Sequence, residues 1–272
     1  HSQSGEPLSG IEVQVLRQQP DGNWSQERTV STDLYGEYYT GPLETALYRL
    51  RFKDPQGVFA FQYYNNKANL GDATTIPIVG DLVPNIDAVL EPGGGISGSI
   101  QMYDGQSPGM PTISLYQHDG TAWRFLFSQW LMPSLSSPVI TYTVSGLPSG
   151  TYKVNFNAPK GYRSEWYKNK KTFDSATQVT VTEPKITSGI NAVLDAGGSI
   201  AGTVANEEGA GIANVDVQVV DLTGLWRSGA RTGPNGSYTA TGLAAGSYRV
   251  SFTPPAGSGY SIEWYDNKAS QD

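Results

Sequence analysis

The chain has 272 residues, of which 16% are charged, and its formal net charge is −7. Contacts with phosphates dominate the affinity of nucleic-acid binders, so this acidic balance disfavours that class and disfavours binding to anionic membranes as well. There are no cysteines, which excludes disulfides, thiolate zinc sites and cysteine nucleophiles. No apolar run in the sequence approaches the ~20 residues that a membrane-spanning helix needs.

The rest of the composition is typical of short strands joined by tight turns. Glycine (32) and proline (17) are plentiful, and aromatic residues make up 11% of the chain. Small secreted animal domains are often disulfide-bonded, so a cysteine-free chain of this texture favours a secreted or cell-surface protein of bacterial or archaeal origin.

The first stretch of the chain predicts half-buried strands. Residues 11–16 read Ile-Glu-Val-Gln-Val-Leu, an alternation of apolar and polar residues with a period of two. The elements expected after it are a turn at 40–43, a strand at 48–52, an aromatic block at 62–67 and strands at 75–79 and 85–90.

The same blocks then return in the same order. A glycine-rich opening strand, Gly-Ile-Ser-Gly at 95–98, returns as Ser-Ile-Ala-Gly at 199–202. The turn and strand of the first stretch return at 145–156 and 241–252, and the aromatic block returns at 165–170 and 263–268. Ordered blocks in successive copies predict a tandem repeat.

We therefore predict an all-β fold of three tandem Greek-key-type β-sandwich repeats, the first and the last of them incomplete. About 100 residues with seven or eight short strands suits a sandwich of two antiparallel sheets. The expected repeats are residues 1–93, 94–197 and 198–272. The linker before residue 198 is short and is no Ser/Thr/Pro stalk, so we expect semi-rigid joints.

These blocks resemble the carboxypeptidase regulatory-like domain family, part of a wider set of prealbumin-like and Cna-B-like sandwiches. The residues that carry the resemblance are Gly95–Gly98, Gly198–Gly202, Val215–Val217, Asn235–Tyr238 and Gly242–Phe252. The resemblance implies a seven-stranded sandwich that is usually not catalytic and is often arrayed on microbial surface proteins.

On this pattern, residue 1 falls just after an opening strand, and residue 272 follows soon after the third aromatic block. An incomplete sandwich exposes an apolar edge, which is a liability. Our hypothesis is that copies of the chain complete one another head-to-tail, because heterologous contacts that do not close give filaments. The alternative is that the sequence is a window of a longer protein.

Candidate catalytic residues are few. His1 and His118 are the two histidines, and a copper histidine brace made from them is disfavoured because they lie in different repeats. Glu165 and Glu263 recur with Gln62 at the matched position, so we interpret them as partners of Lys170 and Lys268. No Gly-x-Ser-x-Gly motif with a usable histidine is present. We predict no catalytic residues, no enzyme activity and no cofactor.

Two further kinds of site stay open as alternatives. Loop carboxylates at 33, 37, 104, 207 and 208 allow calcium, although no calcium-loop motif is present. A Lys–Asn crosslink of the kind found in some adhesin domains has candidates in Lys170, Asn169, Asn191 and Glu165. Because no calcium-loop motif is present, we predict no metal site. The opening strands lack the lysine that such a crosslink uses, so we expect no crosslink.

The tryptophans divide into two groups. Trp24, Trp123 and Trp226 recur after the alternating strand, which favours a structural role in a core or a joint. Trp130 has no counterpart, and we predict it as a ligand contact. The sequence thus predicts a non-enzymatic building unit of an extracellular filament or stalk that binds copies of itself. The alternative is an adhesin or accessory module that binds surface glycans or proteins.

Overall fold

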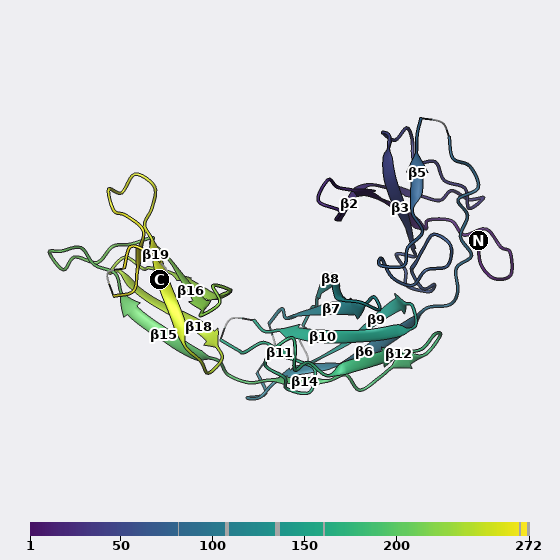
Figure 1. The fold of residues 1–272 in the computed structure, drawn as a ribbon. Helices are drawn as coiled ribbons and strands as arrows, with labels where there is room; N and C mark the ends of the chain where they lie inside the picture. The colour runs from purple at the N-terminus through teal and green to yellow at the C-terminus, as the bar shows by residue number, and fades with distance from the viewer. Residues whose placement is uncertain (81, 107–108, 134–136, 160, 267, 271–272) are drawn as a thin grey trace.

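The structure is a computed structural model that describes residues 1–272 apart from 81, 107–108, 134–136, 160, 267 and 271–272. Every regular element in the described part of the chain is a strand, which confirms the predicted all-β class. The strands fall into three groups that follow one another along a curved row (Figure 1). We keep the predicted repeats as names for these groups. None of the described segments is a helix long and apolar enough to cross a membrane.

The second repeat has two sheets packed face to face. One sheet has the order β11-β10-β7-β8, with β12 also on β10; in the other, β6 lies between β9 and the parallel strands β13 and β14. The strands are β6 (Gly94–Met102), β7 (Thr112–His118), β8 (Trp123–Trp130), β9 (Val139–Leu147), β10 (Gly150–Asn157), β11 (Glu165–Trp166), β12 (Gln178–Val181), β13 (Ile186–Thr187) and β14 (Ala192–Leu194).

The core of this repeat follows from alternation along the strands. Successive side chains of a strand point to opposite faces, so every second residue enters the space between the sheets. Val154 and Phe156 of β10 meet Ile96 and Ile100 of β6 there, and each of these side chains is at most 1% exposed. Strands β6 and β9 of one sheet therefore pack against β7 and β10 of the other in this core.

The first repeat forms one complete sheet of order β2-β1-β3-β4, with β5 also paired to β3. Its strands are β1 (Glu12–Gln18), β2 (Trp24–Ser31), β3 (Ala46–Lys53), β4 (Gln62–Tyr63) and β5 (Ile76–Ile78). The prediction of a strand at 85–90 is wrong. The structure has only an isolated bridge there, between Leu90 and Ser2. In the second repeat the matching segment pairs with β6, and a strand needs such a neighbour to satisfy its backbone groups.

The third repeat has a four-stranded sheet, β17-β16-β19-β20, and a two-stranded sheet, β15-β18. Its strands are β15 (Gly198–Thr203), β16 (Asp216–Asp221), β17 (Trp226–Arg231), β18 (Ser237–Leu243), β19 (Tyr248–Thr253) and β20 (Glu263–Trp264). Val217, Val219 and Val250 form its core together with Tyr238 and Ala240.

The recurring aromatic block is a tight hairpin. Tyr63 and Lys67 exchange backbone hydrogen bonds of 2.7 and 3.1 Å, and Asn65 and Asn66 between them have positive φ angles of 67° and 56°. Three residues, Tyr64, Asn65 and Asn66, separate the bonded pair, and asparagine tolerates the positive φ that the last two adopt. The recurring lysine is thus held through its backbone. Among the described residues no ion pair joins it to the recurring carboxylate, which corrects our interpretation of Glu165 and Lys170.

Candidate functional site

The first and second repeats meet at a joint in which three glycines approach closely. A Cβ atom on Gly93 would lie 2.6 Å from the Cα of Gly146, and a Cβ on Gly146 would lie 3.0 Å from the Cα of Gly57. The first of these distances is shorter than real Cβ contacts, and the second is tighter than most of them. A backbone hydrogen bond crosses the joint from Phe61 N to Gly146 O at 3.0 Å, and another, from Gly93 N to Val58 O at 2.8 Å, holds the linker on a loop of the first repeat. The two backbones are therefore packed against one another directly.

The second and third repeats meet in the same way. A Cβ on Gly197 would lie 2.3 Å from the Cα of Gly242, and a Cβ on Gly242 would lie 2.8 Å from the carbonyl oxygen of Tyr162. The backbone N–H of Gly197 donates to the carbonyl of Gly161 over 2.9 Å, and that of Arg163 donates to Asp195 over 2.8 Å, so both bonds hold the linker on a loop of the second repeat. The close contact of a linker glycine with a turn glycine of the next repeat is thus built twice in the chain.

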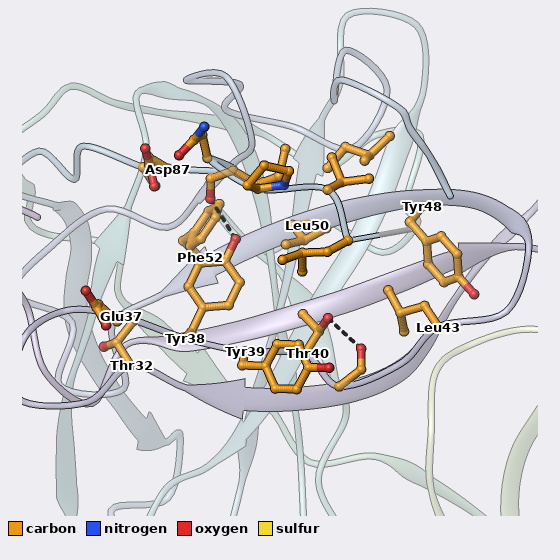
Figure 2. A pocket seen from close by; sticks show the side chains of 18 of the residues that line it. Thr32, Glu37, Tyr38, Tyr39, Thr40, Leu43, Tyr48, Leu50, Phe52 and Asp87 are labelled. Atoms are coloured by element: carbon orange, nitrogen blue, oxygen red, sulfur yellow. Dashed lines mark hydrogen bonds between the residues drawn. The ribbon is translucent and has the colours of Figure 1, made fainter. Parts of the chain in front are cut away.

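The first repeat has an open groove of about 560 Å³ beside its sheet. Figure 2 shows Tyr38, Tyr39 and Thr40 on one side, Asp87 on the other and Leu50 and Phe52 between them. Leu50 and Phe52 come from the core face of β3, and the two walls come from the segments 36–43 and 80–90. The floor of the groove is therefore the apolar face of a sheet.

The walls of the groove are tied together at one point. The hydroxyl of Tyr38 donates to the carbonyl of Ile86 over 2.6 Å, and its ring lies edge-on to Phe52 with 5.8 Å between ring centroids. In the second repeat the hydroxyl of Tyr142 donates to Ile190 over 2.6 Å. Burial raises the pKa of both tyrosines, so each hydroxyl stays protonated and donates.

The outer face of the second repeat carries a cluster of aromatic side chains. The ring of Phe173 lies 5.3 Å from Tyr116, 6.1 Å from Trp123 and 5.2 Å from Trp166. The ammonium of Lys153 lies 4.3 Å from the centroid of Phe173 and donates to its carbonyl over 2.7 Å. The cluster therefore buries a cation among aromatic faces, an arrangement that is attractive when it is desolvated.

Trp130 lies on the edge strand β8, opposite Thr112 of β7, and 68% of it is exposed. Thr112 and Ser114 accept hydrogen bonds from Asn157 over 3.0 and 2.8 Å on the same face. The face therefore offers an exposed indole beside hydroxyl and amide groups. Trp130 as a ligand contact stays a prediction.

Of the three tryptophans that follow the alternating strand, two occupy the same register position. Trp24 pairs with Gln18 and Trp123 pairs with His118, and the cations of Arg49 and Lys153 lie over these two rings. Trp226 pairs with Val220, which occupies the position of Tyr116, so Trp226 corresponds in register to Phe125. The sequence spacing concealed this shift because the turns before these strands differ in length.

Glu165 is a carboxyl group of the second repeat with a strongly raised pKa. Burial and, to a smaller extent, the negative charge of Asp195 raise the pKa of Glu165 to about 7, and the cation of Arg163 opposes them. Only 4% of the residue is exposed. A buried carboxyl near neutrality is a feature of many active sites, but no nucleophile or metal ligand set accompanies this one in the described residues.

The remaining predicted site residues do not converge. His1 donates from its terminal ammonium to Ala88 over 3.0 Å, whereas His118 contacts Trp123. Asp33 accepts two backbone N–H groups of its own turn, at 2.9 Å each. Asn191 accepts from the backbone and hydroxyl of Ser99, so its side chain is already engaged. Within the described ranges no three His, Cys, Asp or Glu residues gather to hold a metal ion.

Sequence reasoning missed the joint glycines and the groove. The glycines were visible as parts of repeated turns, at 41, 146 and 242, but their spatial partners come from the neighbouring repeat. The groove depends on which strand lies next to which, and the pattern of a single strand does not contain that information.

Comparisons with known proteins agree with the fold. Residues 199–265 match the model of the carboxypeptidase regulatory-like domain, which confirms the resemblance seen in the sequence. Serine-aspartate repeat-containing protein E of Staphylococcus aureus is 24% identical over 280 residues, and the alignment covers 92% of this chain and 24% of the relative. The bone sialoprotein-binding protein of S. aureus is also 24% identical and covers 92% of this chain. The chain spans about a quarter of the length of the curated relatives it matches.

Similar solved structures include a streptococcal ancillary pilin, with 12% identity and a TM-score of 0.33, covering 97% of this chain and 90% of the pilin. Another is the shaft pilin SpaA of Lactobacillus rhamnosus GG, with 11% identity and a TM-score of 0.27, covering 72% of this chain and 91% of the pilin.

Proposed function

We propose that this chain is a non-enzymatic structural part of the bacterial cell surface, a stiff row of β-sandwich repeats that extends head-to-tail into a stalk or filament. The observation that carries the proposal is the close contact of a linker glycine with a turn glycine of the next repeat, which recurs between both pairs of neighbouring repeats. A chain that repeats its joint as well as its domain has a defined geometry along its whole length.

The joint supports a mechanical role for a physical reason. Flexible linkers let domains rotate, whereas backbones in direct contact with crossing hydrogen bonds resist rotation. In both joints a backbone hydrogen bond of 2.8 or 2.9 Å holds the linker on a loop of the preceding repeat, and at the first joint Phe61 N also donates to Gly146 O of the next repeat over 3.0 Å. Force applied along the row is therefore shared between the covalent chain and these contacts.

Both ends of the row offer one half of the same joint. In the first repeat Gly41 has the positive φ angle of Gly146 and Gly242, at 72°, and a Cβ there would meet Arg28 and no atom of another repeat. In the third repeat, Gly257 follows β19 as Gly161 follows β10. These two surfaces support a head-to-tail contact of the same geometry.

The relatives support the location. The matched curated relatives are staphylococcal surface proteins, and one is named for binding bone sialoprotein. We extend the surface location, and no individual ligand, to this chain.

The head-to-tail contact is tested by sedimentation velocity at rising protein concentration. Tyr260 and Ile262 lie in the exposed loop after β19, at 47% and 60% exposure, where the matching loop of the second repeat forms its joint. We expect the double change Tyr260→Ser with Ile262→Ser to weaken self-association. The matched control is Leu225→Ser, equally exposed at 58% but at the other end of that repeat. A chain that stays monomeric at every concentration contradicts self-assembly of separate copies.

A second function, ligand binding on the outer face of the second repeat, is favoured by one observation. Trp130 is exposed beside the hydrogen-bonding row of Thr112, Ser114 and Asn157. Exposed indoles next to amides and hydroxyls suit the apolar face and hydroxyl edge of a sugar ring. Binding to a glycan array that disappears on Trp130→Ala tests this function separately from assembly.

A further inference from the structure

We infer that the outer face of the second repeat binds an acidic oligosaccharide, with a sugar ring on Trp130 and its anionic groups on the lysines of the hairpin at 166–171. The inference rests on the ligand-binding function proposed above for this face, and it adds the chemical class of the ligand. Two features distinguish this face from the same face of the other two repeats: an uncharged edge and additional lysines.

The outer faces of the three repeats can be compared position by position, because each sheet contains the same pair of a β-branched residue with a phenylalanine. These pairs are Val13 with Phe52, Ile113 with Phe156 and Val217 with Phe252. Successive side chains of a strand point to opposite faces, so the residue before each β-branched residue lies on the outer face. Those outward-facing residues are Glu12, Thr112 and Asp216.

The second repeat is uncharged at this position, whereas the other two repeats carry ion pairs there. The ion pairs are Glu12 with Lys53 over 3.6 Å and Asp216 with Arg231 over 3.3 Å. In the second repeat Thr112 pairs with Asn157 on one side and with Trp130 on the other. A hydroxyl, an amide and an exposed indole thus replace the charges. These groups suit the hydroxyls and the apolar face of a sugar ring.

A row of outward-facing residues next to Thr112 crosses the whole sheet. From β8 to the return strand of the hairpin, the residues that pair in succession are Ser128, Ser114, Asn155, Trp166 and Lys170. Residues directly opposite one another share a face, so Lys170 lies on the same face as Trp166. Strands lie about 4.8 Å apart, and four steps span about 19 Å. A ligand that reaches both ends of the row is therefore an oligosaccharide and not a single sugar.

The hairpin at the end of this row is richer in lysine than its two counterparts. Lys170 recurs in all three repeats, whereas Lys168 and Lys171 occur only in the second. All three are exposed, and none of them forms an ion pair in the part of the chain that the structure describes. Residues 166–174 contain these lysines and one carboxylate, Asp174, which leaves a net charge of +2.

This local charge determines which ligand the face attracts. The whole chain carries a net charge of −7, but at 0.1 M salt exposed charges more than about 10 Å away are largely screened. The lysines of the hairpin therefore set the potential at their end of the row. Carboxylate or sulfate groups on a sugar chain complement them, while the sugar rings contact the uncharged edge beside Trp130.

The test measures binding of the 272-residue chain to four soluble polymers by calorimetry. Heparin carries sulfates, polygalacturonate carries carboxylates only, dextran is a neutral glycan, and polyphosphate is an anion without sugar rings. We expect saturable binding of heparin or polygalacturonate and much weaker binding of dextran and polyphosphate. The comparison of heparin with polygalacturonate assigns the anionic group.

Two variants and a matched control locate the contact. We expect Lys168→Gln with Lys171→Gln to weaken binding of the acidic glycan about five- to tenfold, and Trp130→Ala to weaken it as well. The control is Lys185→Glu, which changes the net charge by the same two units at an exposed residue just before β13, in the other sheet of this repeat. We expect the control to bind as the parent chain does.

The outcomes that overturn the inference differ from those that overturn the proposed function. Trp130-dependent binding of neutral glycans alone leaves the ligand-binding function standing and removes the acidic class. An absence of binding to any glycan removes both. Equal affinity for polyphosphate, or an equal loss on Lys185→Glu, shows attraction of any polyanion to the chain and contradicts recognition of a sugar on this face.

Discussion

The hydroxyl of Tyr142 donates a hydrogen bond to the carbonyl of Ile190 over 2.6 Å, across the middle of β6, where Gly98 pairs with Tyr142. The same bond joins Tyr38 and Ile86 in the first repeat, where the groove between the two walls is open. The same hydrogen bond is thus enclosed in the second repeat and lies in an open groove in the first. Its contribution to stability can therefore be compared between the two repeats.

We expect Tyr142→Phe to lower the free energy of unfolding of the second repeat by about 1–2 kcal/mol, because a buried carbonyl then loses its donor. Tyr38→Phe is expected to cost less than about 1 kcal/mol, since water reaches the carbonyl of Ile86 in the open groove. Urea unfolding followed by hydrogen exchange of amides in β9 and β3 separates the two effects. Equal costs for the two changes would show that the first groove is closed in solution.

Glu165→Gln tests the buried carboxyl. Its pKa rises from an ordinary 4.5 to about 7 in the folded chain, so the folded state favours the protonated form. The associated stability is fully present below about pH 4.5 and is lost as the pH rises through 7. We expect the variant to match the parent at pH 4 and to be more stable by about 2 kcal/mol at pH 8.

The chain supplies its own controls for that change. Glutamine already stands at the matched position 62 of the first repeat. In the third repeat Glu263 is exposed, and we expect Glu263→Gln to leave the unfolding free energy unchanged at both pH values. Denaturant titrations at pH 4 and pH 8 measure the difference, and a variant that is less stable than the parent at pH 8 contradicts this interpretation of Glu165.

Gly93→Ala tests the joint. The new Cβ would lie 2.6 Å from the Cα of Gly146, and neither backbone can move away without opening the joint. We expect the strands of each repeat to persist in circular dichroism while small-angle X-ray scattering shows a broader distribution of interatomic distances. Gly198→Ala is the control, because its Cβ would meet Leu243 at an ordinary 3.4 Å. Identical scattering curves for the two variants would mean that the joint is not stiff.

Trp130→Ala and Trp123→Ala compare an exposed tryptophan with one that packs against other side chains. Trp130 is mostly exposed, so its loss is expected to change stability by less than about 0.5 kcal/mol. Trp123 packs on Phe173 and lies 4.6 Å from the ammonium of Lys153, so its loss is expected to cost about 1–3 kcal/mol. Thermal unfolding of both variants decides the point, and a large loss of stability on Trp130→Ala would remove it as a ligand contact.

The sequence was sufficient for the fold class because alternation with period two places Val13 and Val15, or Ile113 and Leu115, on one face without further information. It was insufficient for the register of Trp226, where the length of the turn decides which residue lies opposite Val220. It was also insufficient at 85–90, where the alternation is present and the neighbouring strand is not. A local pattern of residues predicts a strand, but a strand forms only where a neighbouring strand pairs with it.

For the candidate sites, too, the sequence predicted some features and missed others. Trp130 was predicted from its lack of a counterpart, and the structure places it on an exposed edge strand. The importance of Gly93 and Gly146 arises from a contact between residues of different repeats. A residue type in a turn does not show which backbone approaches it.

The central claim, a stiff head-to-tail row on the bacterial surface, is tested most directly by immunogold electron microscopy of cells that make the protein. Antibodies against an exposed outer face, such as that around Trp130, avoid the joints. We expect gold particles in lines along fibres or stalks that project from the cell. Label that is confined to the cell interior, or scattered on the surface without any linear structure, would contradict the account.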